Sequence, residues 1–154
     1  MLQLIFALLG ISLMAATATA MVTVINPAPI IAAREAARLQ DGFTALQTGY
    51  QNYTDATHAL PSSLGDFTPS YAFLPPAPKG AGWSLGLDSS GLQYVCVSGS
   101  LTSVQLQAVQ MLSREFSPQA YYIGNACGSR TAPSGGMVAA YLLVRPGANF
   151  GASP

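Results

Sequence analysis

The sequence has few charged residues and no excess of either sign. Of its 154 residues only 8% are charged, with six Lys or Arg and six Asp or Glu, whereas an average soluble protein has about 25%. Nucleic-acid binding depends on basic side chains that neutralise phosphates, so this composition argues against a nucleic-acid partner. Because 50% of the residues are hydrophobic, intrinsic disorder does not explain the low charge.

The residues that usually carry catalysis and metal binding are scarce and scattered. His58 is the single histidine, and it lies beside a proline-rich segment without a nearby nucleophile or orienting partner. The acidic residues occur as singletons, and the common hydrolase, metalloprotease and phosphate-loop motifs are missing. We therefore predict no catalytic residue, no metal site, no cofactor and no small-molecule substrate, which means that the protein is not an enzyme.

The chain has only two cysteines, Cys96 and Cys127. A zinc site needs closely spaced pairs and more ligands, so the two are either buried thiols of a cytosolic protein or a disulfide of an exported one. The N-terminal segment favours export, and we predict the disulfide. Closing a loop of this length stabilises a fold by about 3–4 kcal/mol on the chain-entropy model.

A long apolar run opens the chain, and the first charged residue is Arg34. As a helix, residues 1–25 reach about 37 Å, which is enough to cross a hydrocarbon core of about 30 Å. The competing interpretation is a secretory signal that is cleaved after Ala20. No Lys or Arg precedes the apolar core, and apolar residues continue to Ile25. We therefore favour an uncleaved transmembrane anchor over 1–25.

An amphipathic pattern follows the break at Asn26-Pro27-Ala28-Pro29 and predicts a helix over 30–57. Its apolar residues are spaced alternately by four and three positions, which places them on one face of a helix. They are Ala32, Ala36, Leu39, Phe43, Leu46, Tyr50 and Tyr53. The last five form a candidate interface stripe, which packs either on the chain's own sheet or on helices of neighbouring proteins.

The segment 58–145 is predicted to be an α+β domain with a small antiparallel sheet. Two proline-bearing loops come first, with Tyr71 and Phe73 as expected packing anchors. The further elements expected are a β-hairpin over 82–97, a turn at Ser98-Gly99-Ser100, a helix over 101–116, and strands over 121–124 and 137–144. Residues 146–154 are expected to form a flexible tail. The predicted fold class is thus α+β, with an N-terminal transmembrane helix that continues into an amphipathic helix packed on the sheet.

Several of these features together resemble the type IV pilin-like design. They are the apolar helix that continues as an amphipathic helix, Leu60-Pro61-Ser62-Ser63-Leu64, Gly82-Trp83 at the start of a sheet, and a late disulfide. Pilin subunits have a short leader ending in Gly and a glutamate at the fifth position of the mature chain. Here Met1 opens the apolar run directly, and position 5 is Ile5. The sequence is more similar to the PilM family of type IVb (thin) pilus systems, with Tyr94-Val95-Cys96 among the matching motifs.

This resemblance implies a membrane-anchored structural or assembly component of conjugative thin-pilus biogenesis, which acts by protein–protein contacts. It implies a location in the bacterial inner membrane with the C-terminal domain in the periplasm. The implied partners are other pilus assembly proteins or pilins, and the family has no known active-site residues to carry over. Two alternatives stay open: a minor pilin or pseudopilin within the filament, and a secreted periplasmic binding protein or hydrolase released after Ala20.

Overall fold

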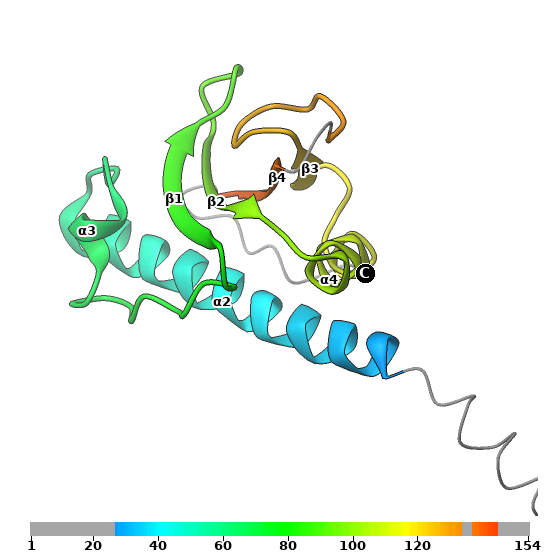
Figure 1. Cartoon of the computed structure of the whole chain (residues 1–154). Helices are drawn as coiled ribbons and strands as arrows, with labels where there is room; N and C mark the ends of the chain where they lie inside the picture. The colour runs from blue at the N-terminus through cyan, green and yellow to red at the C-terminus, as the bar shows by residue number, and fades with distance from the viewer. Residues whose placement is uncertain (1–26, 134–136, 145–154) are drawn as a thin grey trace, which may run out of the picture. The chain divides into compact units, whose positions relative to one another are not determined.

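The computed structural model describes residues 27–133 and 137–144 of the 154-residue chain. The elements are α2 (Ala28–Thr57), α3 (Leu64–Phe67), β1 (Ala81–Leu87), β2 (Gln93–Ser100), α4 (Ser103–Leu112), β3 (Tyr121–Gly124) and β4 (Met137–Leu143), as Figure 1 shows. The chain divides into two units at Ile30. The sheet and the helical residues from Ile31 onward belong to the second unit, Ile31–Pro154.

The residues at the two ends of helix α2 explain where it begins and ends. Pro29 lies in the first turn, where its missing N–H would have no partner within the helix, and an alanine-rich stretch with high helix propensity follows. At the other end His58 adopts a left-handed backbone with φ of 54°. Its N–H donates to the carbonyl of Thr54 at 2.8 Å. This bond satisfies one of the last carbonyls of the helix and ends it.

Four strands form one antiparallel sheet in the order β1-β2-β4-β3. Strands β1 and β2 are a hairpin in which Trp83 is opposite Val97 and Leu85 is opposite Val95. Strand β4 follows the other three described strands in sequence but pairs on both of its sides, with β2 and with β3. The centre of the sheet therefore consists of β2 and β4, while β1 and β3 form its edges.

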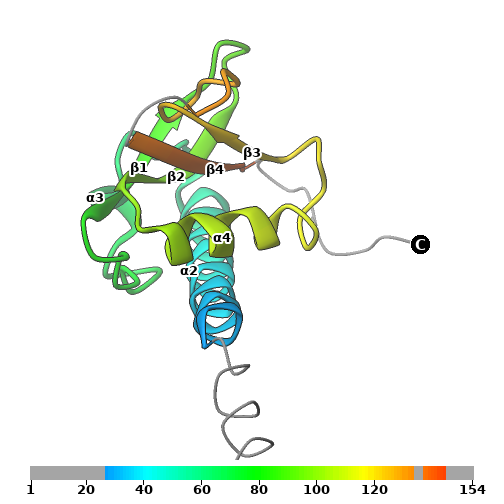
Figure 2. The same cartoon turned by 45° about the vertical axis from the view of Figure 1, so that its right-hand side comes forward.

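Helices α2 and α4 cover the same face of this sheet (Figures 1 and 2). Phe43 of α2 lies at the centre of the core between them and is fully buried. Its ring makes edge-to-face contacts with Trp83, Phe116 and Tyr121, at centroid distances of 5.0, 6.0 and 5.9 Å. Contacts of this kind add about 0.5–1.5 kcal/mol each to the gain from area burial. Phe43 thus joins the helix, the first edge strand and the second edge strand.

Two glycines of α2 leave room for the Trp83 ring of β1 and for the connection between α3 and β1. At Gly42 an added Cβ would lie 2.8 Å from the Trp83 ring. At Gly49 it would collide with the side chain of Ala72 and lie 3.1 Å from the Phe67 ring. The loop can therefore pack directly on the helix, although glycine lowers helix propensity by about 1 kcal/mol relative to alanine.

The predicted fold class needs a correction at its N-terminal end. An α+β domain with an antiparallel sheet is confirmed, and the sheet has four strands. Among residues 27–133 and 137–144, however, no helix is both long and apolar enough to cross a membrane. Helix α2 is long enough with 30 residues, but it carries Arg34, Glu35, Arg38, Asp41 and Asp55. The anchor predicted over 1–25 and the tail predicted over 146–154 lie outside the described residues.

Two local predictions are wrong. Phe73 does not anchor the loop before β1, because its side chain is 84% exposed. The buried aromatic residue in this region is Phe67, at the end of α3. The stretch Ser98-Gly99-Ser100 is the end of β2 and not a turn. Glycine is needed there because the backbone of Gly80 approaches Gly99 too closely for a side chain.

Replacing Gly49 by alanine is expected to destabilise the protein. At an exposed helix position this change stabilises by about 1 kcal/mol, but here the new methyl group meets Ala72. Moving the loop away from the helix should cost on the order of 1–3 kcal/mol. Urea unfolding followed by circular dichroism measures the difference from the wild type.

Ala45→Gly, on the exposed side of the same helix, is the matched control. It should lower stability by about 1 kcal/mol through helix propensity alone. A Gly49→Ala protein about 1 kcal/mol more stable than the wild type, as helix propensity alone predicts, would contradict the close contact between α2 and the loop.

Candidate interaction surface

The structure places the candidate stripe against the chain's own sheet. Its first four members are at most 2% exposed: Leu39, Phe43, Leu46 and Tyr50. Tyr53 is partly buried and packs edge-on against Tyr71, with ring centroids 5.6 Å apart. The Tyr50 hydroxyl also donates to the side chain of Gln93 at 2.5 Å, which ties the helix to β2. A partner that contacts α2 must therefore use the other side of the helix.

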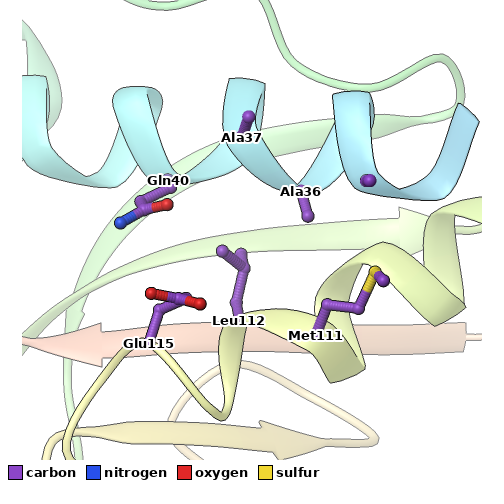
Figure 3. A pocket seen from close by; sticks show the side chains of 7 residues that line it. Ala36, Ala37, Gln40, Met111, Leu112 and Glu115 are labelled. Atoms are coloured by element: carbon purple, nitrogen blue, oxygen red, sulfur yellow. The ribbon is translucent and has the colours of Figure 1, made fainter. Parts of the chain in front are cut away.

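One flank of α2, beside the stripe, has small residues and borders a groove. The groove is formed by Ala33, Ala36, Ala37 and Gln40 of α2 together with Met111 and Leu112 of α4 and Glu115 just after it (Figure 3). Ala33 and Ala37 are exposed, whereas Leu112 is buried. The groove thus has a wall of small side chains on α2 and an apolar floor from α4.

The groove is apolar over most of its length and polar at one end. Gln40 and Glu115 approach each other at that end, and Met111 lies towards the other (Figure 3). Its volume is about 200 Å³, which is below the roughly 300–1,000 Å³ of a typical small-molecule site. A single apolar side chain of another protein suits this space better than a metabolite does.

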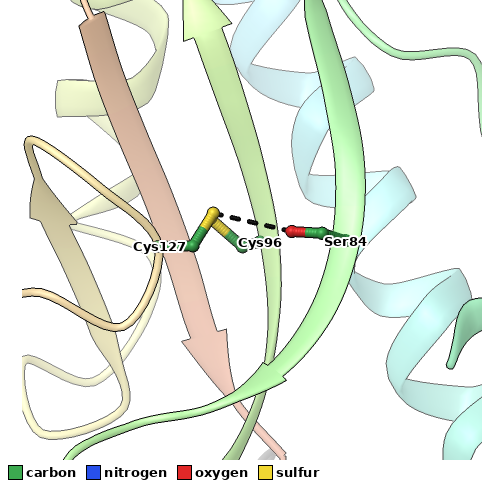
Figure 4. Close-up of a disulfide and its surroundings, with 3 residues drawn as sticks. All are labelled: Ser84, Cys96 and Cys127. Carbon is green, nitrogen blue, oxygen red and sulfur yellow. Dashed lines mark hydrogen bonds between the residues drawn. A yellow bond between two sulfur atoms is a disulfide. The ribbon is translucent and has the colours of Figure 1, made fainter. Parts of the chain in front are cut away.

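The predicted disulfide between Cys96 and Cys127 is confirmed. Cys96 lies on β2 and Cys127 in the loop after β3, with Cα atoms 5.9 Å apart (Figure 4). Cys96 belongs to a second apolar cluster with Tyr94 and Tyr141, on the sheet face opposite the one that α2 covers. The Ser84 hydroxyl of β1 lies 3.5 Å from the sulfur of Cys127. The bond therefore holds the loop after β3 over the outer face of the sheet.

An ion pair between Asp88 and Arg130 is a second link between the loop after β3 and the rest of the sheet. The side chain of Asp88, just after β1, is only 1% exposed, and its Oδ2 lies 3.7 Å from the guanidinium of Arg130. Its Oδ1 accepts from the hydroxyl and N–H of Ser90 and from the N–H of Leu92. The Ser90 hydroxyl first, then the two N–H groups and the Arg130 charge, hold the pKa of Asp88 below its ordinary value of 3.8, although burial opposes this shift. Arg130 also lies 4.4 Å above the Tyr122 ring, a cation–π contact.

Sequence reasoning did not identify the groove or this ion pair. The signal for the groove was present as alanines at positions 33 and 37, off the apolar stripe and four residues apart. The signal for Asp88 was its place at the start of a turn with Ser90, where a carboxylate commonly bonds the N–H two residues on. The pairing with Arg130 had no local signal, because the two residues are distant in the sequence.

The potential acid–base and metal-binding side chains of the described segments remain apart. His58 is exposed at the end of α2. Within residues 27–133 and 137–144, no three His, Cys, Asp or Glu side chains are grouped so that they could hold a metal ion. The groove between α2 and α4 is accordingly the candidate binding site of the described surface.

Comparison with known proteins gives no significant match, whether to protein-family models, to curated proteins or to solved structures. The resemblance to the pilin-like design and to the PilM family therefore stays a prediction.

Removing the disulfide is expected to lower the free energy of unfolding by about 3–4 kcal/mol, because the unfolded chain gains the freedom of the opened loop. The two cysteines are 31 residues apart in the sequence. Urea unfolding of the Cys96→Ala, Cys127→Ala double variant measures the loss, and reduced wild-type protein should match that variant. If the intact mass did not rise by two hydrogens on reduction, the bond itself would be contradicted.

Acid is expected to lower the stability that the Asp88 carboxylate contributes through its hydrogen bonds and its ion pair with Arg130. Since its pKa in the folded protein lies below the ordinary 3.8, the stability from Asp88 is fully present above 3.8 and is lost as the pH falls through the folded pKa. Because the Ser90 hydroxyl is the largest cause, Ser90→Ala should raise the pKa of Asp88 more than Arg130→Gln does. NMR titration of the Asp88 carboxyl carbon in both variants measures this order, and equal shifts would refute it.

Proposed function

We propose that this protein is an exported structural component of type IVb (thin) pilus biogenesis, which acts by protein–protein contacts. The observation that supports this proposal best is how the long helix, the sheet and the disulfide are arranged. A long helix packs its apolar stripe on a four-stranded antiparallel sheet, and a disulfide closes the other face of that sheet. This arrangement supports the pilin-like design that the sequence resembles, in which an amphipathic helix lies on a sheet with a late disulfide.

The disulfide also supports an oxidising location. Structural disulfides persist in compartments such as the bacterial periplasm and are rare in the cytosol. Cys96 is fully buried and Cys127 is half-buried, and buried cysteines of this kind are structural and not reactive. The proposed location of the domain is therefore the periplasm.

The proposed contact site is the groove between α2 and α4. Ala33 and Ala37 let another chain approach the helix closely, and Leu112 offers an apolar floor. Partner residues that fill such a pocket usually supply most of the binding energy, while a polar rim excludes water. Gln40 and Glu115 would form part of that rim. The partner in this proposal is a pilin or another protein of the pilus assembly apparatus, which inserts an apolar side chain into the groove.

Filling the groove should abolish assembly without unfolding the domain. Phe43 and Leu46 are unsuitable for this test because they belong to the core. Ala37→Trp places a large side chain in the groove, whereas Ala45→Trp places the same side chain on an exposed position of α2 outside it. Both variants pay the same small loss of helix propensity, about 0.5 kcal/mol. Each is expressed in a strain that lacks the wild-type gene, and surface pili are counted by electron microscopy.

The expected result is loss of pili with Ala37→Trp and normal piliation with Ala45→Trp, at equal levels of disulfide-bonded protein. Normal piliation with both variants would rule out the groove as the contact site. Normal piliation in the strain without any copy of the gene would rule out the proposed function altogether. Recovery of the protein in sheared pili would make it a subunit of the filament and not of the assembly apparatus.

A further inference from the structure

Strand β1 leaves one edge of the sheet open. It is the first strand in the order β1-β2-β4-β3, and no helix or strand runs along its outer side in Figure 1. The ladder to β2 determines which of its backbone groups face outward. At one end the Gly80 carbonyl accepts from Ser100, and at the other the Asp88 N–H donates to Leu92. Since bonded positions alternate along an antiparallel pair, the even-numbered residues of β1 bond to β2.

Three odd-numbered residues of β1 consequently present free hydrogen-bonding groups, whereas the N–H of the fourth, Ala81, donates to the Pro78 carbonyl. Trp83, Leu85 and Leu87 direct their N–H and C=O groups away from the sheet, and no strand of the described part of the chain pairs with them. The side chains of Trp83 and Leu85 pack against the main core but are only half-buried. Both the backbone and the core side chains of this edge are therefore incompletely covered.

Nothing within β1 opposes pairing with another strand. Natural edge strands are commonly protected by lysine, proline, a bulge or a very short length. Strand β1 has seven residues, Ala-Gly-Trp-Ser-Leu-Gly-Leu, without charge or proline. The opposite edge, β3, has four residues. The edge strand β3 is thus protected by its short length, whereas the longer edge strand β1 has no such protection.

We propose that β1 pairs with β1 of a second copy of this chain, antiparallel about a twofold axis at Ser84. This register overlaps the whole strand. Trp83 of one copy then exchanges both backbone hydrogen bonds with Leu85 of the other. The Ala81 carbonyl accepts from the Leu87 N–H of the other copy, while the Ala81 N–H stays bonded to the Pro78 carbonyl of its own chain. Cross-strand neighbours lie on the same face of a sheet, so each Trp83 ring covers a half-buried Leu85 of the other copy. The two sheets become one continuous sheet.

The surroundings of the strand favour a second copy as the occupant. The formal net charge of the chain is zero, so two copies meet without net repulsion. The loop before β1 adds apolar surface on the same side, because Pro75 and Trp83 both lie against Gly42. Phe73 and Leu74, which precede Pro75, are 84% and 54% exposed. These exposed apolar side chains belong to the segment that leads into β1.

This inference rests on the proposed function only for its biological purpose, since pairing through β1 is a property of the purified chain. It also uses a different surface from the groove between α2 and α4. A negative result in the piliation test at Ala37 therefore does not contradict the proposed dimer. A monomeric protein likewise does not contradict the proposed contact site in the groove.

Amide hydrogen exchange on the full-length oxidised chain tests the pairing directly. The Leu85 and Leu87 amides should exchange at least about tenfold more slowly at near-millimolar than at micromolar protein concentration, because they are hydrogen-bonded only in the dimer. The Ser84 and Gly86 amides bond to β2 in each copy and should be protected at both concentrations. Fast exchange at Leu85 and Leu87 at every concentration would overturn the proposal.

A pair of variants separates the backbone bond from the side chain. Leu85→Ala removes the side chain and keeps the outward N–H, whereas Leu85→Pro removes both and leaves the ladder to β2 intact. Both keep residues 1–26, so association through that segment is common to them. Sedimentation should show a dimer for the alanine variant and at least a tenfold weaker dimer for the proline variant. Equal association of the two would overturn pairing through this edge, and if the proline variant fails to fold, the exchange measurement on the wild type decides.

Discussion

The burial of one helix stripe against one face of the sheet is the constraint on which the rest of this structure depends. Neither element is stable without the other, because an isolated helix is marginal in water and so is an isolated hairpin. The helix and the sheet depend on each other most directly at Phe43, because its ring contacts both Trp83 on the first edge strand and Tyr121 on the other. The same burial decides the function that can be proposed, because it removes the apolar stripe from the surface and leaves only the small-residue side of α2 for partners.

The other face of the sheet is closed by different means. No helix of the described segments covers it, and its apolar cluster is smaller, built around Tyr94, Cys96 and Tyr141. A loop lies there instead, held by a covalent bond at Cys127 and by the ion pair of Arg130 with Asp88. A loop has little apolar surface of its own to bury, so it needs such specific links to stay in place. The two faces therefore respond to different conditions: the helix face to packing changes, and the loop face to reduction and acid.

Much of the fold could be predicted from local pattern. The spacing by four and three located α2, and alternation with a turn located the β1–β2 hairpin, because both signals are contained within a short stretch of chain. The disulfide followed from the count of cysteines and the apolar N-terminus. The errors occurred where distant segments meet. Phe73 was expected to be buried, yet the loop was anchored by Phe67, and Gly99 was assigned to a turn although the close backbone of Gly80 is what requires it. The groove was missed although Ala33 and Ala37 lie off the apolar stripe, because it exists only where α4 crosses α2.

The place of β4 in the sheet has a consequence for how the chain becomes a domain. Strand β4 follows the other described strands in the sequence but joins β2 to β3 at the centre of the sheet. A chain that emerges from its N-terminal end, as in synthesis or translocation, can form α2 and the β1–β2 hairpin early, since their contacts are local. It cannot complete the core until Met137–Leu143 has arrived. Until then the side of β2 that β4 will occupy is an open strand edge, and Cys96 lacks the neighbour strand that covers it. The arrival of β4 thus sets the moment at which the core can close.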